Sequence, residues 1–277
     1  MMMEIPESHT IARQLESIVK GKVVADVSAA ASPHKFAFYF GSPESYRGLL
    51  MGKTLGRTKA HAGQVEMEAD EVRLLFADGV NIRYCAEQKN LPRKHQLLLE
   101  FEDGSALVCT IQMYGGMWAF REGENENPYY LATKEKPSPL SDDFDESYFD
   151  ALFASNKPSL SAKAFLAAEQ RIPGLGNGVL QDILFEAGIN PKSKISMLSD
   201  GQRGLLYGSL KRNLASMARQ GGRDTEKDLF GEEGGYTTRL SARTFGKPCP
   251  TCGGEIVRQA YMGGNVYYCP RCQPVQS

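Results

Sequence analysis

The chain has 277 residues and a formal charge of −1, so its overall charge does not by itself point to a polyanionic partner. Its 42% hydrophobic and 23% charged residues are typical of a soluble globular protein, and with no apolar run of about 18 residues a membrane span is not expected. The charge is unevenly spread. Residues 150–277 carry 16 Lys and Arg against 11 Asp and Glu, whereas the preceding part carries 16 against 22. Nucleic-acid binding is therefore expected in the second half or in a cleft between the halves; the alternative is scatter without function.

The N-terminal part predicts one helix followed by a set of short β-strands. Ile11, Leu15, Ile18 and Val19 share one helical face, and Pro6 lies near the expected start of the helix. Stretches rich in β-forming residues follow at 23–27, 35–40, 72–76, 96–101 and 106–112. Strands of this length and spacing favour an antiparallel sandwich or barrel.

Residues 134–146 predict an interdomain linker. Two prolines disfavour regular structure there, and the acidic run is typical of a solvated surface. The strand patterns then stop, and helices are expected at 145–155, 161–171, 178–187 and 199–220. Ser199 and Asp200 supply a cap for the last of these helices.

Four cysteines near the C-terminus predict a metal site. Cys249 and Cys252 form one CxxC pair, Cys269 and Cys272 form another, and sixteen residues separate the pairs. Two such knuckles supply the four thiolates of a tetrahedral Zn²⁺ site, and the spacer predicts a β-hairpin that turns at Gly263-Gly264. The alternative is two disulfides in a secreted protein. We favour zinc, because no signal peptide is recognisable and the other two cysteines lack this spacing.

A glycine-rich turn between two predicted helices offers a site for an anion. Gly174-Leu-Gly176-Asn177 opens the helix that ends near Gly188. Free backbone N–H groups at such a helix start can bind a phosphate, and Asn177 adds a side-chain donor. Taken alone, the pattern is equally consistent with a plain helix–turn–helix packing element.

Together, these features resemble the formamidopyrimidine-DNA glycosylase and endonuclease VIII family of base-excision-repair enzymes, over nearly the whole chain. The turn at residues 174–177 resembles the family's helix–two-turn–helix DNA clamp, and residues 249–272 resemble its zinc finger. Residues 139–144 are similar to its linker. Residues 3–7, Met-Glu-Ile-Pro-Glu, are similar to its N-terminal catalytic signature.

The resemblance implies a mechanism and two catalytic residues. In the family, an N-terminal α-amine, normally on proline, attacks C1′ of the deoxyribose and forms a Schiff base. The adjacent glutamate handles protons, the base leaves, and β-elimination nicks the strand. Met3 stands in the place of the proline and Glu4 in that of the glutamate. An α-amine has a reference pKa of ~7.7–8.0, which leaves a neutral fraction near pH 7. We expect activity if Met3 is the mature terminus. If Met1 is retained, the amine is displaced by two residues of ~3.3–3.6 Å each.

The resemblance also implies DNA contacts by Lys94 and Lys163, together with the amides of Gly174 and Gly176 and the side chain of Asn177. Lys163 lies fourteen residues before Asn177, as the family's phosphate-binding lysine does. For Lys94, the alternative is a simple solvated turn.

Some family positions depart from the pattern. Gln64 falls near the family's hairpin lysine, with Lys59 and His61 close by as substitutes. Gly264 stands at the finger arginine that grips a phosphate, and Arg258, across the predicted hairpin, is a partial replacement. The wedge residues that fill a vacated base position fall near Tyr84 and Met113-Tyr114. The alternative for both tyrosines is ordinary strand packing.

The sequence therefore predicts an α+β multidomain fold. It consists of an N-terminal antiparallel β-sandwich with a leading helix (1–133), a helix–two-turn–helix domain (134–231) and a zinc-ribbon β-hairpin (232–277). The expected function is a DNA glycosylase with apurinic/apyrimidinic lyase activity on oxidised or abasic duplex DNA. The alternatives are a catalytically impaired damaged-DNA binder and, more distantly, a zinc-ribbon adaptor. We expect a cytoplasmic monomer with structural Zn²⁺ and no nucleotide cofactor.

Overall fold

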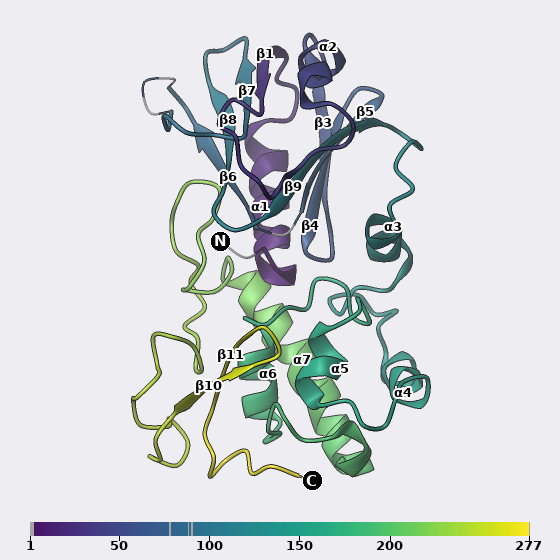
Figure 1. The fold of residues 1–277 in the computed structure, drawn as a ribbon, viewed down its shortest axis with the longest axis vertical. Helices are drawn as coiled ribbons and strands as arrows, with labels where there is room; N and C mark the ends of the chain where they lie inside the picture. The colour runs from purple at the N-terminus through teal and green to yellow at the C-terminus, as the bar shows by residue number, and fades with distance from the viewer. Residues whose placement is uncertain (1–2, 78, 88, 90, 277) are drawn as a thin grey trace.

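The structure is a computed structural model, and it describes residues 3–77, 79–87, 89 and 91–276. Two halves are stacked along the long axis, with the β-rich half above the helical half and a two-stranded hairpin beside the helices (Figure 1). Helix α1 (Ile5–Ile18) begins at the junction of the halves and runs up against β3 and β4, while its other partner is α7. The predicted order of β-sandwich, helices and hairpin is confirmed.

The upper half consists of two sheets. The four-stranded sheet has the order β1 (Val24–Ala29), β7 (Leu97–Phe101), β8 (Ala106–Ile111), β6 (Val80–Cys85). The five-stranded sheet has the order β2 (Ala37–Phe38), β9 (Gly115–Arg121), β5 (Val72–Ala77), β4 (Gln64–Ala69), β3 (Leu55–His61). All neighbouring strands are antiparallel except β2 and β9, which are parallel.

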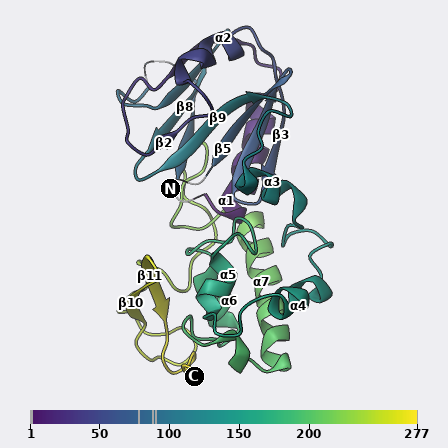
Figure 2. The same ribbon diagram turned by 45° about the vertical axis from the view of Figure 1, so that its right-hand side comes forward.

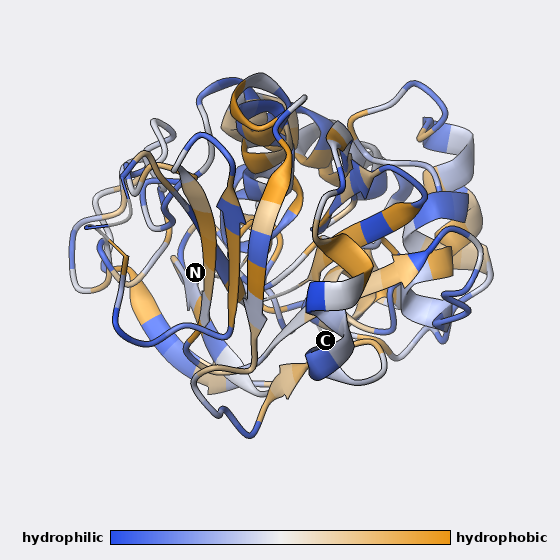
Figure 3. Cartoon of the chain, turned by 90° about the horizontal axis from the view of Figure 1, so that it is seen from above, coloured by the Kyte–Doolittle hydropathy of each residue, from blue (hydrophilic) through white to orange (hydrophobic). Residues whose placement is uncertain are grey.

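One apolar core fills the space between these sheets and α1. Ile11 and Leu15 of the helix are fully buried against strand residues such as Leu74 and Phe76. From above, hydrophobic segments of the strands alternate with hydrophilic ones (Figure 3). The short helix α2 (Tyr46–Leu50) closes the core, because the buried Tyr46 hydroxyl donates to the Met117 carbonyl at 2.9 Å. Removal of this apolar surface from water stabilises the half.

The lower half contains α3 (Pro128–Glu135), α4 (Glu146–Ala154), α5 (Ala162–Ala167), α6 (Leu180–Glu186) and α7 (Asp200–Arg219). Short 3₁₀ turns span Pro43–Ser45 in the upper half and Ile195–Met197 here. The predicted cap of α7 is confirmed: Ser199 accepts from the Gln202 N–H at 3.3 Å, and the Gln202 side chain accepts from the Ser199 N–H at 3.0 Å. This reciprocal arrangement is a capping box. Figure 2 shows α5, α6 and α7 packed side by side.

The C-terminal hairpin pairs β10 (Val257–Tyr261) with β11 (Gly264–Tyr268). It packs beside α6, where the Tyr267 N–H donates to Gln181 at 3.0 Å. The predicted hairpin is therefore present, but its turn is Met262-Gly263 rather than Gly263-Gly264. Gly264 is instead the first residue of β11 and pairs with Tyr261.

Several predicted boundaries were wrong. Only Ala37–Phe38 of the stretch 35–40 is a strand, because it pairs with just two residues at the edge of its sheet. The helix predicted at 161–171 stops at Ala167, since Glu169 and Gln170 take positive φ angles of 56° and 50°. Helix α3 extends into the predicted linker as far as Glu135. Strands β3, β4, β6 and β9 and helices α2 and α3 were not predicted.

Two segments connect the cores of the two halves: the start of α1 and residues 221–236. Ile5, at the start of α1, packs in the helical core. Leu229, in the segment 221–236 that follows α7, is fully buried in the sandwich core, and its carbonyl accepts from the Tyr84 N–H at 3.0 Å. The segment 221–236 thus crosses from the helical half to the sandwich and back.

Candidate functional site

The carboxylate of Glu4 lies where the two halves meet. Glu4 is the N-cap residue of α1, and its side chain accepts from the Gly178 and Val179 N–H groups at 2.8 Å each. These donors lie in the turn that leads into α6, because Val179 is the N-cap residue of that helix and Gly178 precedes it. N–H groups at a helix start lack intrahelical partners and favour a negative charge. Glu4 is only 2% exposed. A carboxylate from one end of the chain therefore binds at the helix start where the sequence predicted a phosphate.

A buried arginine lies next to this carboxylate. Arg223 donates to both carboxylate oxygens of Glu7 at 2.9 Å, from Nε and from Nη2. Its Nη1 lies 3.6 Å from Glu4, and its backbone N–H also donates to Glu7, at 3.1 Å. The arginine and both carboxylates are each at most 3% exposed. A Cβ on Gly178 would lie 1.4 Å from Nη1, so only glycine leaves room for the guanidinium there.

The electrostatics of this cluster favour a proton on Glu4. Burial raises the pKa of Glu4, and the nearby charge of Glu7 adds to that effect, whereas Arg223 and the Gly178 and Val179 amides lower it without cancelling it. Burial also opposes the charge on Arg223, but Glu4, Glu7 and Glu226 together raise the pKa of the guanidinium. Arg223 therefore stays charged and contacts both carboxylates, with two hydrogen bonds to Glu7 and a longer contact to Glu4. Glu4 is left as the carboxyl that can exchange a proton, as candidate catalytic carboxyls do.

A hollow of about 230 Å³ opens beside Glu4. The residues around it come from both halves: Met3, Glu4, Tyr114, Tyr129, Ala167, Gln170, Ile172, Gly174, Leu175, Gly176 and Asn177. Two glycines are required for this close packing. A Cβ on Gly174 would lie 2.2 Å from the Gly63 nitrogen, and one on Gly176 would lie 2.6 Å from the Glu4 carboxyl carbon. The structure therefore brings the predicted residues Met3, Glu4 and Asn177 together around one cavity.

Lys163 and Asn177 meet at the tip of the hairpin. Lys163 is 5% exposed and donates to the Tyr261 carbonyl at 2.6 Å, while Asn177 Nδ2 donates to the Asn265 carbonyl at 2.9 Å. Burial lowers the pKa of Lys163. A Cβ on Gly264 would lie 3.5 Å from Asn177 Nδ2 and 3.6 Å from Lys163 Nζ. A side chain at position 264 would therefore reach this pair, and glycine leaves that space open.

The other predicted DNA-binding residues, Arg258 and Lys94, do not join the Lys163–Asn177 pair. Arg258 stacks over the Phe245 ring at 5.0 Å and pairs with Tyr267, so it lies on the opposite face of the hairpin from Gly264. Its expected role as a replacement at position 264 does not fit that placement. Lys94 is exposed in the segment before β7.

The cavity lining does not include Gln64 or its two predicted substitutes, Lys59 and His61. Gln64 is fully buried at the start of β4, where its side-chain oxygen accepts from Thr133 at 3.2 Å. Lys59 is exposed on β3, and His61 Nε2 lies 3.7 Å from the Glu66 carboxylate. Tyr84 packs edge-on against Phe230, with ring centroids 6.5 Å apart. For Tyr84, this is the strand-packing alternative.

The sequence did not identify Arg223 and Glu7 as a buried pair. Their positions are 216 residues apart, and nothing local distinguishes this arginine from a surface one. The one available signal is the acidic pair three residues apart at the start of α1, because two carboxylates in a buried helix start require a cation.

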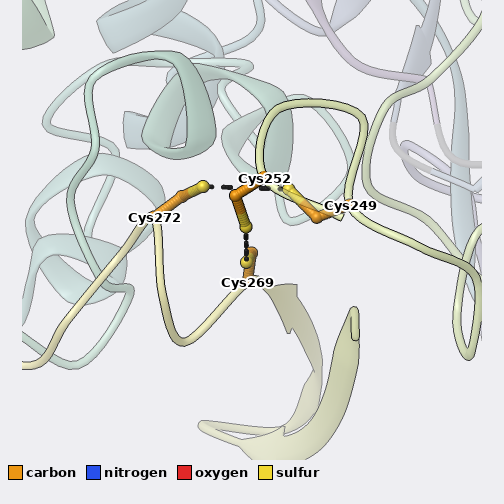
Figure 4. Close-up of side chains that lie close together, drawn as sticks. All are labelled: Cys249, Cys252, Cys269 and Cys272. Carbon is orange, nitrogen blue, oxygen red and sulfur yellow. Dashed lines mark hydrogen bonds between the residues drawn. The ribbon is translucent and has the colours of Figure 1, made fainter. Parts of the chain in front are cut away.

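The four cysteines form the metal-type cluster that the spacing predicted. Figure 4 shows Cys249 and Cys252 in one loop and Cys269 and Cys272 in the loop after β11, with their sulfurs turned toward one another. All four sulfurs lie within 4.8 Å of each other. The Cys249–Cys272 sulfur distance is 3.8 Å and the Cys252–Cys269 distance is 3.5 Å. A disulfide, at about 2.05 Å, does not match these separations. The cluster can hold one metal ion.

No helix among the described residues combines the length and the apolar character needed to span a membrane. No protein-family model matches the chain. A formamidopyrimidine-DNA glycosylase of Lactococcus lactis subsp. cremoris is 27% identical over 278 residues, which cover 98% of this chain and 99% of the relative. One of Brevibacillus brevis is 28% identical over 281 residues, which cover 99% of this chain and 100% of the relative.

Solved structures agree with these relatives. The wild-type Lactococcus lactis Fpg (MutM), in a complex with DNA that contains N7-benzyl-Fapy-dG, superimposes with a TM-score of 0.83 at 25% identity, covering 98% of this chain and 99% of that one. MutM (Fpg) of Thermus thermophilus has the same fold, with a TM-score of 0.82 at 24% identity over 99% of this chain and 100% of that one. Over nearly its whole length, the chain is similar to formamidopyrimidine-DNA glycosylases in both sequence and fold.

Proposed function

We propose that this protein is a base-excision-repair DNA glycosylase with apurinic/apyrimidinic lyase activity. The observation that carries the proposal is the buried Glu4, held at the edge of a cavity by Arg223 and by two amides of the turn before α6. The relatives that match the chain over nearly its whole length are formamidopyrimidine-DNA glycosylases. Structural neighbours are complexes with damaged DNA and with abasic-site DNA.

The roles of Met3 and Glu4 follow from their positions at the cavity. In a protein that begins at Met3, the α-amine would lie next to Glu4, and both residues line the cavity. The amine attacks C1′ of the damaged nucleoside, the C1′–N bond to the base breaks, and the base leaves with a proton. The sugar opens to a Schiff base, loss of a C2′ proton expels the 3′ phosphate, and hydrolysis frees the amine. Burial raises the pKa of Glu4, which suits a carboxyl that transfers a proton to or from the reacting nucleoside.

Duplex DNA binding is proposed for the surface around Lys163 and Asn177. Both residues lie against the hairpin, and Asn177 also lines the cavity, so a phosphate bound here would place the adjacent sugar close to Glu4. The Gly178 and Val179 amides bind Glu4, so in this proposal the phosphates are bound by Lys163, Asn177 and the amides of Gly174 and Gly176.

A second candidate function is a damaged-DNA binder with impaired catalysis. It is favoured by Gln64, which is buried and bonded to Thr133 where the family has a lysine. It is also favoured by Gly264, which leaves the space beside Lys163 without a side chain. These substitutions remove two cations from the region in which the family does its chemistry, while the fold and the Lys163–Asn177 pair remain.

Borohydride trapping separates the two functions. A Met3-start form is incubated with duplex DNA that contains an abasic site or an oxidised base, with borohydride to reduce any Schiff base to a stable protein–DNA adduct. The glycosylase/lyase proposal predicts an adduct for this form and a much weaker one when residues 1 and 2 precede Met3. If DNA is bound without an adduct, the binder is correct. An adduct through a lysine would keep the enzyme but discard Met3 as the nucleophile.

We also propose that the four cysteines hold one structural Zn²⁺. Tetrahedral coordination at a Zn–S distance of about 2.3 Å separates the sulfurs by roughly 3.8 Å, close to the 3.5 Å and 3.8 Å observed. The ion would fix the two loops that flank the hairpin, and with them the position of Asn265 beside Asn177. Four thiolates leave no open position, so the ion supplies structure rather than chemistry.

A further inference from the structure

An exposed apolar groove lies directly beside the cavity that contains Glu4. Four large side chains line it, and they are exposed to an unusual degree for their size: Phe36 (47%), Phe38 (49%), Met113 (68%) and Tyr114 (40%). His34, Lys35 and Gln112 complete the lining. Tyr114 lines both this groove and the Glu4 cavity, so the two are neighbours separated by a single side chain.

The backbone holds the two phenylalanines next to Tyr114. The Phe36 carbonyl accepts from the Gly115 N–H at 3.0 Å, and β2 pairs in parallel with the start of β9, with Phe38 opposite Gly116. Phe36 lies in the turn just before β2 and Phe38 is the last residue of β2, and both side chains line the groove. Phe36 and Phe38 therefore present a double aromatic surface at a fixed position relative to Tyr114.

The chemistry of the groove selects a flat, uncharged ring attached to an anion. The Lys35 ammonium lies 5.3 Å above the Phe36 ring, and the groove lining among the described residues contains no carboxylate. A nucleobase matches both features, since its π face stacks on aromatic rings and its own phosphates are attracted to a neighbouring cation. An uncharged lipid or an apolar peptide without acidic groups would match the rings but would gain nothing from the lysine.

We propose that Phe36 and Phe38 form a stacking platform for the unpaired base that faces the lesion from the opposite strand. The inference rests on the proposed function. If the damaged nucleotide occupies the cavity beside Glu4, its former partner is the base that has lost its pairing. Tyr114, between cavity and groove, separates the two positions. The stretch 34–38 would thereby make the protein sensitive to which base, if any, lies opposite the damage.

The platform is tested with the double variant Phe36→Ala/Phe38→Ala, using Leu205→Ala on α7 as the matched control because it removes an equally exposed apolar side chain (57%). The probe is a short duplex with a tetrahydrofuran abasic analogue opposite 2-aminopurine, whose fluorescence reports stacking. A second duplex has the same analogue opposite another abasic analogue. Affinity is measured by anisotropy at one fixed salt concentration, and thermal unfolding verifies that each variant is folded.

For the wild-type protein and Leu205→Ala, we expect 2-aminopurine fluorescence to change on binding and affinity to be higher when a base is present opposite the lesion. The double variant should lose the fluorescence change and ~5- to 150-fold in affinity for that duplex. It should bind the duplex without an opposite base as the wild type does. A Phe36→Tyr/Phe38→Tyr variant should restore the wild-type behaviour.

Two results would overturn the platform: unchanged behaviour of the double variant, or an equal loss on both duplexes. The second result would indicate a general DNA contact rather than a base contact. Failure of the proposed function has a different signature. In that case the wild-type protein binds neither damaged duplex in preference to undamaged DNA and forms no borohydride adduct, whatever the variants do.

Discussion

The buried Arg223–Glu7 pair provides the sharpest test of how this site is held together. The variants are Arg223→Met, Glu7→Gln and the double variant, each close in volume to the wild-type side chains. The guanidinium makes two contacts of 2.9 Å to Glu7, and both residues are nearly inaccessible to solvent. At an effective dielectric constant of about 20, unit charges at this separation attract by about 6 kcal/mol, while each buried ion loses several kcal/mol of hydration.

Removal of one partner leaves the other charge buried without its main counterion. Arg223→Met should therefore lower the free energy of unfolding by about 3–5 kcal/mol. Glu7→Gln should cost less, because Glu4 and Glu226 remain 3.6 Å and 4.0 Å from the guanidinium. In the double variant neither charge is left alone, so its loss should be smaller than the sum of the single losses by at least ~1.5 kcal/mol.

The pH dependence gives a second readout of the same cluster. Arg223 lowers the pKa of Glu4, so Arg223→Met raises it further. A carboxyl whose pKa is higher in the folded than in the unfolded protein destabilises the fold at pH values at which it is charged. This destabilisation disappears once the carboxyl is protonated. The stability deficit of Arg223→Met should therefore shrink as the pH falls from 7 toward 5.

Chemical denaturation followed by circular dichroism, at pH 7 and pH 5, measures both effects. The reasoning is refuted if the two single losses add within ~0.5 kcal/mol in the double variant, or if Arg223→Met unfolds at the wild-type denaturant concentration. A deficit that grows on acidification would contradict the assigned sign of the Glu4 shift.

Three further predictions concern the cavity, the hairpin and the metal. Glu4→Gln should reduce single-turnover base excision by about 10²–10⁴-fold. It should also stabilise the fold at neutral but not at acidic pH, because the raised pKa of Glu4 is lost; unchanged excision would remove Glu4 from the mechanism. Lys163→Ala should weaken binding to all DNA sequences alike and reduce the steepness of log K against log salt concentration by ~0.9. Asn177→Ala should likewise weaken binding independently of sequence. A sequence-selective loss would contradict a phosphate contact. Cys252→Ser should lose the ~1 equivalent of zinc found by metal analysis in the wild type; a variant that keeps both zinc and fold would contradict the four-thiolate site.

The parts of this protein that the sequence determined by itself are those with local causes. The two CxxC pairs, the cap at Ser199 and the apolar face of α1 each depend on residues within one turn or one helix. The family resemblance likewise depends on short motifs in chain order, and the comparisons over the whole chain confirm it. A single turn brings the two sulfurs of a CxxC pair together, so the metal site can be recognised from the sequence without knowledge of the fold.

Tertiary structure alone decided the rest. Strand β4 is buried at five of its six positions, so it lacks the alternating pattern by which a half-exposed strand is recognised. Glu4 occupies the helix start that the sequence predicted for a phosphate, because folding brings Glu4 into contact with Gly178, which lies 174 residues later in the chain. Arg223 reaches Glu7 in the same way, and its charge matters only because water is excluded from both residues. Burial and long-range proximity are properties of the folded chain, and they set the charge of the candidate catalytic group.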